Sequence, residues 1–205
     1  MKTNLNKWIL LAAFVISGFT ALIYEVAWIR PLQLIFGSTI YAISTILTSF
    51  MFGFALGSYT HRDLADNVKN PALLFAGLQL GIGLYGLIAP FLFAILPSIY
   101  FSLLNLPLIQ FIQFFLIFLV IIIPATLFGA TWPVMTKTYS TLNDLGEDSA
   151  KLYSFNSLGA VLGSLSSGFL LIPLLGITKT SFLAASLNLL TALIIFIKFR
   201  RKNEP

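Results

Sequence analysis

Six apolar runs dominate this sequence of 205 residues, and each is long enough for a helix to cross a hydrocarbon core of ~30 Å. The runs cover residues 8–29, 39–59, 72–96, 108–131, 153–173 and 180–197. Helices are expected because open sheets cannot satisfy their backbone groups in lipid, and the alternating pattern of a membrane barrel is not seen. The sequence therefore predicts an all-α integral membrane protein with six transmembrane helices in a single membrane domain, residues 1–205.

Composition narrows the classes of function. Hydrophobic residues make up 58% of the chain and charged residues only 9%, against about 25% charged in soluble domains. The six runs leave no room for a separate catalytic domain, and the chain has no cysteine and one histidine, His61. We therefore expect no catalytic residues, no metal and no cofactor. The net charge of +5 is scattered at the edges of the apolar runs, so the expected partner is the lipid bilayer and not nucleic acid.

The distribution of basic residues predicts the orientation. Positive charges favour the cytoplasmic side of a membrane protein. With the N-terminus inside, the outer segments hold only Arg30 and Lys179, and the cytoplasmic segments hold Lys2, Lys7, Arg62, Lys69, Lys137, Lys151, Lys198, Arg200, Arg201 and Lys202. We therefore predict a multi-pass protein of the plasma membrane with both termini in the cytoplasm. The first run is interpreted as a retained span rather than a signal peptide, because it continues to Ile29 without a convincing cleavage site.

Local signals support several helix ends. Asn70 followed by Pro71 is typical of the start of a helix, and acidic residues 147–148 suit the first turn of the fifth helix. Gly176 is expected to end that helix. The stretch 97–107 is apolar but too short to cross, so we expect an outer loop or an interfacial helix there.

Small residues recur four positions apart in three of the runs, a spacing that lets helix backbones approach closely. The pairs are Gly53 and Gly57, Gly77 and Gly81, and Gly159 and Gly163. Packing between helices of one chain explains such rows. A dimer face, or helices that slide during transport, is the alternative.

Glu25 is the one ionisable residue placed inside a predicted span, about 10 Å from the centre of the first helix. It shares a helical face with Ala21 and Trp28, so it is expected to meet another helix rather than lipid. The functional hypothesis is a carboxylate that binds a cation or exchanges a proton. The alternative is an anchor in the outer leaflet, beside Tyr24 and Trp28 and paired with Arg30.

Uncharged amides complete the set of predicted substrate-binding residues. Gln79, Asn156 and Asn188 lie inside spans, where amides commonly form hydrogen bonds between helices. Contact with a substrate is the other interpretation. The candidates are therefore Glu25, Trp28, Gln79, Asn156 and Asn188, and the sequence contains no nucleotide-binding, nucleophile or metal-protease motif.

Six stretches of the sequence form a joint pattern: SGFTALIYEVAWIR (17–30), FGSTIYAISTIL (36–47), FGFALGS (52–58), LADNVKNP (64–71), PATLFGATWP (124–133) and LYSFNSLGAVLGSLSSGFLLIPLLG (152–176). Together they resemble the membrane domain of spermidine synthase-like fusion proteins. The resemblance implies half of a major facilitator fold, joined in that family to a soluble aminopropyltransferase-like part. That soluble part has no counterpart in these residues, so aminopropyl transfer is not expected from this chain alone.

The segment after the second run also resembles the cytoplasmic loop of major facilitators. Arg62, Asp66 and Lys69 are the loop candidates, although the glycine and paired basic residues of that motif are absent. A surface charge at a helix end is the other interpretation of Asp66.

Three hypotheses of function follow. The first is a half-size facilitator-like module that binds or transports a small solute such as a polyamine, as a homodimer, because major facilitators enclose their path between two six-helix halves. The second is a membrane subunit that docks a separately encoded, soluble aminopropyltransferase-like enzyme. The third is a structural membrane protein without a substrate.

Overall fold

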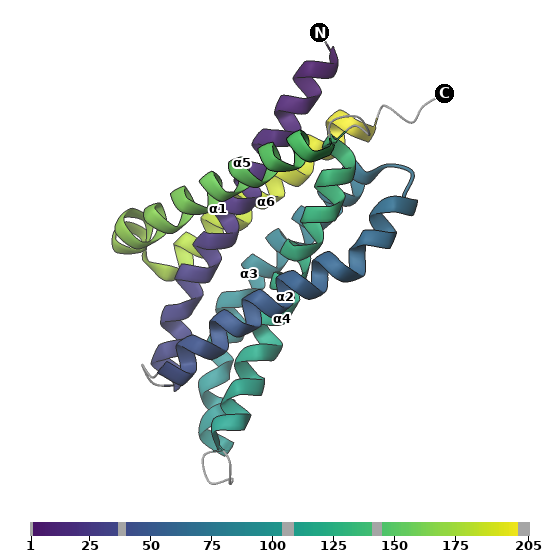
Figure 1. Ribbon diagram of the computed structural model, residues 1–205. Helices are drawn as coiled ribbons and strands as arrows, with labels where there is room; N and C mark the ends of the chain where they lie inside the picture. The colour runs from purple at the N-terminus through teal and green to yellow at the C-terminus, as the bar shows by residue number, and fades with distance from the viewer. Residues whose placement is uncertain (1, 37–39, 104–108, 141–144, 201–205) are drawn as a thin grey trace.

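The computed structural model describes residues 2–36, 40–103, 109–140 and 145–200, and this part of the chain is helical throughout apart from short turns (Figure 1). The elements are α1 (Lys2–Phe36), α2 (Ile40–Asn67), α3 (Pro71–Leu103), α4 (Ile109–Tyr139), α5 (Leu145–Ser166), the short π-helix η1 (Ser167–Leu171) and α6 (Ile172–Arg200). The all-α prediction is confirmed for the described residues.

Five helical segments in the described residues are long and apolar enough to cross a membrane. The last one, Leu145–Arg200, is 56 residues long and contains both the fifth and the sixth predicted spans. A straight helix of that length would measure about 84 Å. Gly176 interrupts it with a φ of +80°, which is accessible to glycine without strain, and Figure 1 shows the chain reversing between α5 and α6. The six predicted spans therefore correspond to five continuous segments, because the last two are joined.

The helix starts follow the sequence signals, but one helix end does not. The Asn70 side chain accepts a hydrogen bond from the Leu73 backbone N–H at 3.3 Å, so it caps α3 as predicted. The stretch 97–107 was expected to form an outer loop or an interfacial helix, and its residues up to Leu103 continue α3 as a helix through Pro97. Its apolar residues favour the helix, and one proline removes only a single backbone donor. Residues 104–108 lie outside the described part of the chain.

The helices pack as neighbouring pairs. α2 runs along α4, α1 along α5 and α3 along α6. Glycines bring the first two pairs into backbone contact, because a Cβ at Gly57 would overlap the Thr126 carbonyl of α4 and a Cβ at Gly163 would overlap the Phe19 carbonyl of α1. These rows therefore act within the chain. Gly77 of α3 differs, because a Cβ there would meet no atom within 4 Å.

Two clusters of buried hydrophobic residues fill the interior, one toward each end of the bundle. On α1 the boundary between them falls between Phe14 and Ala21, and on α6 between Ala184 and Ile195. The polar residues between these positions are themselves buried. They include Ser17 and Thr20 on α1, Gln79 on α3, Thr131 on α4, and Asn188 and Thr191 on α6. A layer of uncharged polar groups therefore separates the two clusters.

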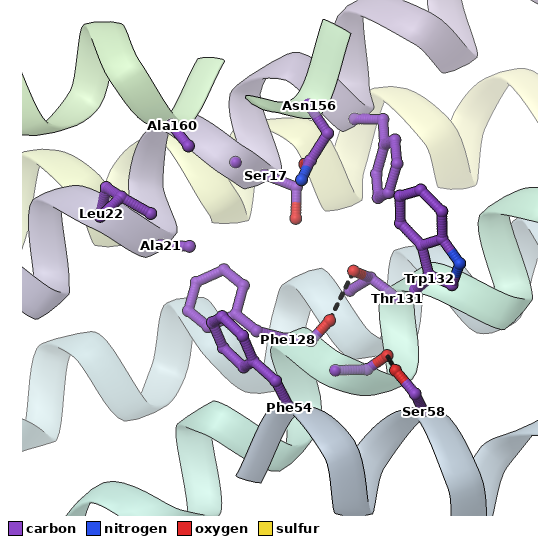
Figure 2. Close-up of a pocket in the computed structure, with 13 residues that line it drawn as sticks. Ser17, Ala21, Leu22, Phe54, Ser58, Phe128, Thr131, Trp132, Asn156 and Ala160 are labelled. Atoms are coloured by element: carbon purple, nitrogen blue, oxygen red, sulfur yellow. Dashed lines mark hydrogen bonds between the residues drawn. The ribbon is translucent and has the colours of Figure 1, made fainter. Parts of the chain in front are cut away.

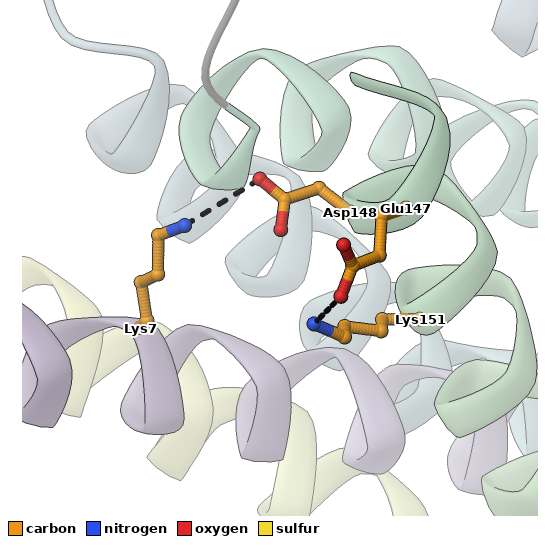
Figure 3. Close-up of polar contacts among 4 residues, drawn as sticks. All are labelled: Lys7, Glu147, Asp148 and Lys151. Atoms are coloured by element: carbon orange, nitrogen blue, oxygen red, sulfur yellow. Dashed lines mark hydrogen bonds and ion pairs between the residues drawn. The ribbon is translucent and has the colours of Figure 1, made fainter. Parts of the chain in front are cut away.

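Polar contacts gather the predicted cytoplasmic segments at one end of the bundle. The Lys7 ammonium lies 3.4 Å from the buried Asp148 carboxylate, which joins the starts of α1 and α5, and Glu147 pairs with Lys151 beside it (Figure 3). The ends of α2 and α4 are joined in the same way by Asp66 and Lys137 at 3.3 Å. We call this end of the bundle the basic end.

Candidate functional site

A cavity of about 210 Å³ lies between the α1/α5 pair and the α2/α4 pair (Figure 2). It opens to the outside of the chain and lies at the level of the polar layer between the two hydrophobic clusters. Its lining combines aromatic rings, small residues and four uncharged polar side chains. The rings are Phe14, Phe54, Phe128 and Trp132, and the polar residues are Ser17, Ser58, Thr131 and Asn156.

Two of the three hydroxyl groups that line this cavity are oriented by the backbone of α4. Ser58 Oγ donates to the Gly129 carbonyl at 2.9 Å, and Thr131 Oγ1 donates to the Phe128 carbonyl at 2.6 Å. Each hydroxyl has then used its proton, so its oxygen is left with acceptor capacity. A group bound here would therefore meet acceptors rather than donors at these two positions.

Asn156 is the one predicted amide that lines the cavity. It extends from α5 toward Gly18 of α1, where a Cβ would lie 2.7 Å from Asn156 Oδ1. The same Cβ would also overlap the Asn156 backbone carbonyl, so Gly18 makes room for both the backbone and the amide of Asn156. With the hydroxyl oxygens and the aromatic faces, the lining suits an uncharged polar group or an ammonium group, which aromatic rings attract.

Glu25 does not line the cavity but lies close to its edge. The cavity-lining Ala21 and Leu22 precede it by four and three residues, so Glu25 shares their helical face about one turn away. It is partly buried, and none of the ion pairs within the described ranges involves it or the exposed Arg30. The Glu25 carboxylate therefore lies about one helical turn from the cavity lining.

Trp28 belongs to the closed core and not to the cavity. Its side chain is fully buried, its Nε1 donates to Ser181 Oγ at 3.2 Å, and its ring packs on Tyr24 with centroids 4.6 Å apart. Tyr24 is fully buried as well. Neither ring is exposed as an interfacial anchor would be, because both pack against other helices.

Asn188 and Gln79 are both fully buried but differ in their partners. Asn188 Oδ1 accepts from Thr20 Oγ1 at 2.9 Å, and its Nδ2 donates to the Tyr24 hydroxyl at 3.4 Å. This amide therefore joins α6 to α1. Gln79 has no hydrogen-bond partner for either atom of its amide within the described part of the chain.

The loop candidates separate into two places. Arg62 and Asp66 line a second cavity of about 610 Å³ at the basic end, together with Lys137 and the buried hydroxyls of Thr136 and Ser140. Lys69 is exposed and lies outside this cavity. The ion pair between Asp66 and Lys137 shows that Asp66 has a partner on another helix.

Trp132 was not predicted from the sequence, although it lines both cavities. Its ring contacts Phe14 with centroids 5.6 Å apart and Tyr153 with centroids 5.9 Å apart. Ser17, Ser58 and Thr131 were missed too. A useful signal was that each hydroxyl lies within a long apolar run, at the level of the predicted amides.

Comparisons with known proteins point to one group of relatives. The chain is 28% identical over 201 residues to polyamine aminopropyltransferases 1 and 2 of Ralstonia nicotianae, and 24% identical over 179 residues to polyamine aminopropyltransferase 2 of Aquifex aeolicus. These matches cover 95%, 95% and 87% of this chain but only 36%, 35% and 34% of the respective relatives. No family model and no solved structure matches. The chain is thus distantly similar to about one third of each of these aminopropyltransferases.

Proposed function

We propose that this chain is a membrane-embedded module that binds a small solute such as a polyamine in the cavity between the α1/α5 and α2/α4 pairs, and that a second copy completes the path. The observation that carries the proposal is the cavity itself. It combines aromatic faces, hydroxyl acceptors and the Asn156 amide, with the Glu25 carboxylate about one turn away.

Six membrane crossings belong to this proposal. The break at Gly176 divides the last 56-residue segment into parts of 31 and 24 residues, each longer than the ~20 residues that a crossing needs. With six crossings, both termini lie on one side. The contacts that join Lys7 to Asp148 and Asp66 to Lys137 support a shared basic end, which the positive-inside rule assigns to the cytoplasm.

A second copy is proposed because the cavity is open on one side. The rings and hydroxyls come from α1, α2 and α4 and the amide comes from α5, whereas α3 and α6 contribute no lining residue. A half of a major facilitator presents its solute path toward the other half, so a homodimer would enclose this surface. We therefore place the partner copy against the cavity and not against α3 and α6.

Uptake by liposomes that contain the purified protein tests the solute. Glu25→Gln is expected to lower uptake of a labelled polyamine by about tenfold, because a tenfold change corresponds to the loss of one charge-assisted contact. Glu147→Gln makes the same chemical change at an exposed site beside Lys151 and should leave uptake unchanged. Uptake that is absent for every amine, or equal in the two variants, would contradict the proposed path.

Cysteine labelling tests the crossings and the second copy, because the chain has no cysteine of its own. An impermeant maleimide added to cells should modify Leu174→Cys, next to the turn at Gly176, but not Leu145→Cys at the start of α5. A bifunctional maleimide should join two copies through Leu22→Cys, at the cavity, and not through Ile88→Cys, which is exposed on α3. Labelling of Leu145→Cys from outside would overturn the topology.

A second candidate function is docking of a soluble aminopropyltransferase-like enzyme. It is favoured by the relatives, which are named for aminopropyl transfer and are about three times as long as this chain. The exposed charges of Arg62, Asp63 and Asp66 at the basic end would form the docking surface. Docking would be favoured over transport if such an enzyme co-purifies with the unmodified chain but not with the Arg62→Ala/Asp66→Ala variant. The unmodified chain should then show no polyamine uptake.

A further inference from the structure

A groove of about 570 Å³ runs between α3 and α6, on the side of the molecule away from the cavity. Eight apolar residues line it: Leu73, Ala76, Gly77, Leu80, Leu189, Ala192, Leu193 and Phe196. Its small residues leave it hollow, and a Cβ at Gly77 would meet no atom within 4 Å. On each helix the lining residues run over eight positions, Leu73 to Leu80 and Leu189 to Phe196, so the lined part is about 10 Å long. Its volume and length suit part of one acyl chain.

Two basic residues lie at one end of this groove. Arg200 follows Phe196 by one helical turn, and its guanidinium lies over the Phe196 ring at 5.5 Å from the centroid. Lys69 precedes Leu73 by four residues, just before the start of α3. The Asn70 side chain donates to the Phe199 carbonyl at 3.2 Å, and this bond brings the neighbouring Lys69 and Arg200 to the same end of the groove.

Both basic side chains are exposed, and neither belongs to an ion pair within the part of the chain that the structure describes. They contrast with Lys7, Lys137 and Lys151, each of which has a carboxylate partner. Because Lys69 and Arg200 lie at helix ends, they would stand at the level of lipid headgroups. Basic sites of this kind beside a groove between helices attract anionic lipid headgroups.

We propose that the α3/α6 groove binds one anionic phospholipid of the surrounding bilayer. Its acyl chain lies in the apolar groove, and Lys69 and Arg200 bind its phosphate. This site rests on the membrane location proposed above but not on the solute or the second copy, which involve the opposite side of the molecule. It gives Lys69 a role outside the cavity that contains Arg62 and Asp66.

Native mass spectrometry of the detergent-purified chain tests the site with phosphatidylglycerol as the probe. Each basic residue near a lipid surface contributes about fivefold, so Lys69→Gln/Arg200→Gln should weaken lipid binding by roughly 25-fold. Lys198→Gln is the matched control, because it removes a charge from the same turn of α6 on a different face and should have no effect. Equal weakening by both would overturn the site.

Gly77→Leu tests the acyl-chain part without changing charge. It should fill the groove and weaken phosphatidylglycerol binding, whereas Gly168→Leu, at another glycine whose Cβ would meet no neighbour, should not. Binding that is unchanged in Gly77→Leu contradicts the proposal, as does equal binding of phosphatidylcholine with the same acyl chains. A dimer fraction that falls in Gly77→Leu without any change in bound lipid would assign the groove to a second copy instead. If Gly77→Leu fails to fold, the exposed basic pair still decides the question.

Discussion

The interior of this chain differs on the two sides of α1. Toward α3 and α6 it is closed, because Trp28, Tyr24 and Asn188 fill the space and bond or stack with one another. Toward α2 and α4 it is open, and a cavity separates the closely packed α1/α5 pair from the closely packed α2/α4 pair. The same kind of amide is thus a structural link on one side, at Asn188, and a group facing a cavity on the other, at Asn156.

The comparison shows where small residues close a gap and where they leave one. Gly57 and Gly163 close the α2/α4 and α1/α5 pairs by backbone contact, which makes each pair one firm wall. Between the two pairs the lining includes rings such as Phe54 and Phe128, and a cavity remains. The cavity therefore depends on close packing beside it.

The largest expected effect is the loss of one of these walls. Gly57→Ala places a methyl group on the Thr126 carbonyl, so α2 and α4 must separate, and we expect the free energy of unfolding to fall by roughly 3 kcal/mol. Gly77→Ala is the matched control, because its methyl group meets nothing and alanine favours a helix by about 1 kcal/mol over glycine. Unfolding in sodium dodecyl sulfate, followed by circular dichroism, measures both. If the Gly57→Ala protein is as stable as the Gly77→Ala protein, the backbone contact at Gly57 does not stabilise the α2/α4 pair.

The sequence predicts the closely packed helix pairs better than it predicts the cavity between them. Apolar runs and the glycine spacing predict the helices and the rows at Gly57 and Gly163, because both depend on residues near one another along the chain. The break at Gly176 was expected for the same local reason. Which face of a helix meets which neighbour depends on the whole bundle.

The candidate site was harder to predict for that reason. Trp28 has an indole N–H donor and lies near Glu25 in sequence, but this N–H donates to Ser181 in the closed half. Asn156 and Trp132 come together only through the packing of α4, α5 and α1. Residue type indicated that polar groups lay within the spans, but not which of them share a cavity.

A smaller effect is expected for the amide of the closed half. Asn188→Ala removes its bonds to Thr20 and Tyr24, and interhelical bonds of this kind contribute about 1 kcal/mol. The free energy of unfolding should fall by about that amount. Asn67→Ala is the control, at an exposed amide that donates to the Asp63 carbonyl of its own helix, and it should change the free energy of unfolding by less than half as much. If Asn188→Ala leaves the free energy of unfolding unchanged, the closed and open halves do not differ in the way described.

The smallest effect on stability is expected in the open half. Asn156→Ala removes an amide that faces the cavity, and the atoms around it remain accessible. The free energy of unfolding should therefore change by less than about 0.5 kcal/mol. Its effect should appear in solute binding, because the cavity loses its one amide and one of its acceptors while the hydroxyls and rings stay in place. Polyamine uptake into liposomes should fall in Asn156→Ala and persist in Asn188→Ala measured well below its unfolding midpoint. If uptake is lost in Asn188→Ala alone, the solute path lies in the half that we describe as closed. If both variants lose uptake equally, the loss reflects lower stability and not a change in the cavity.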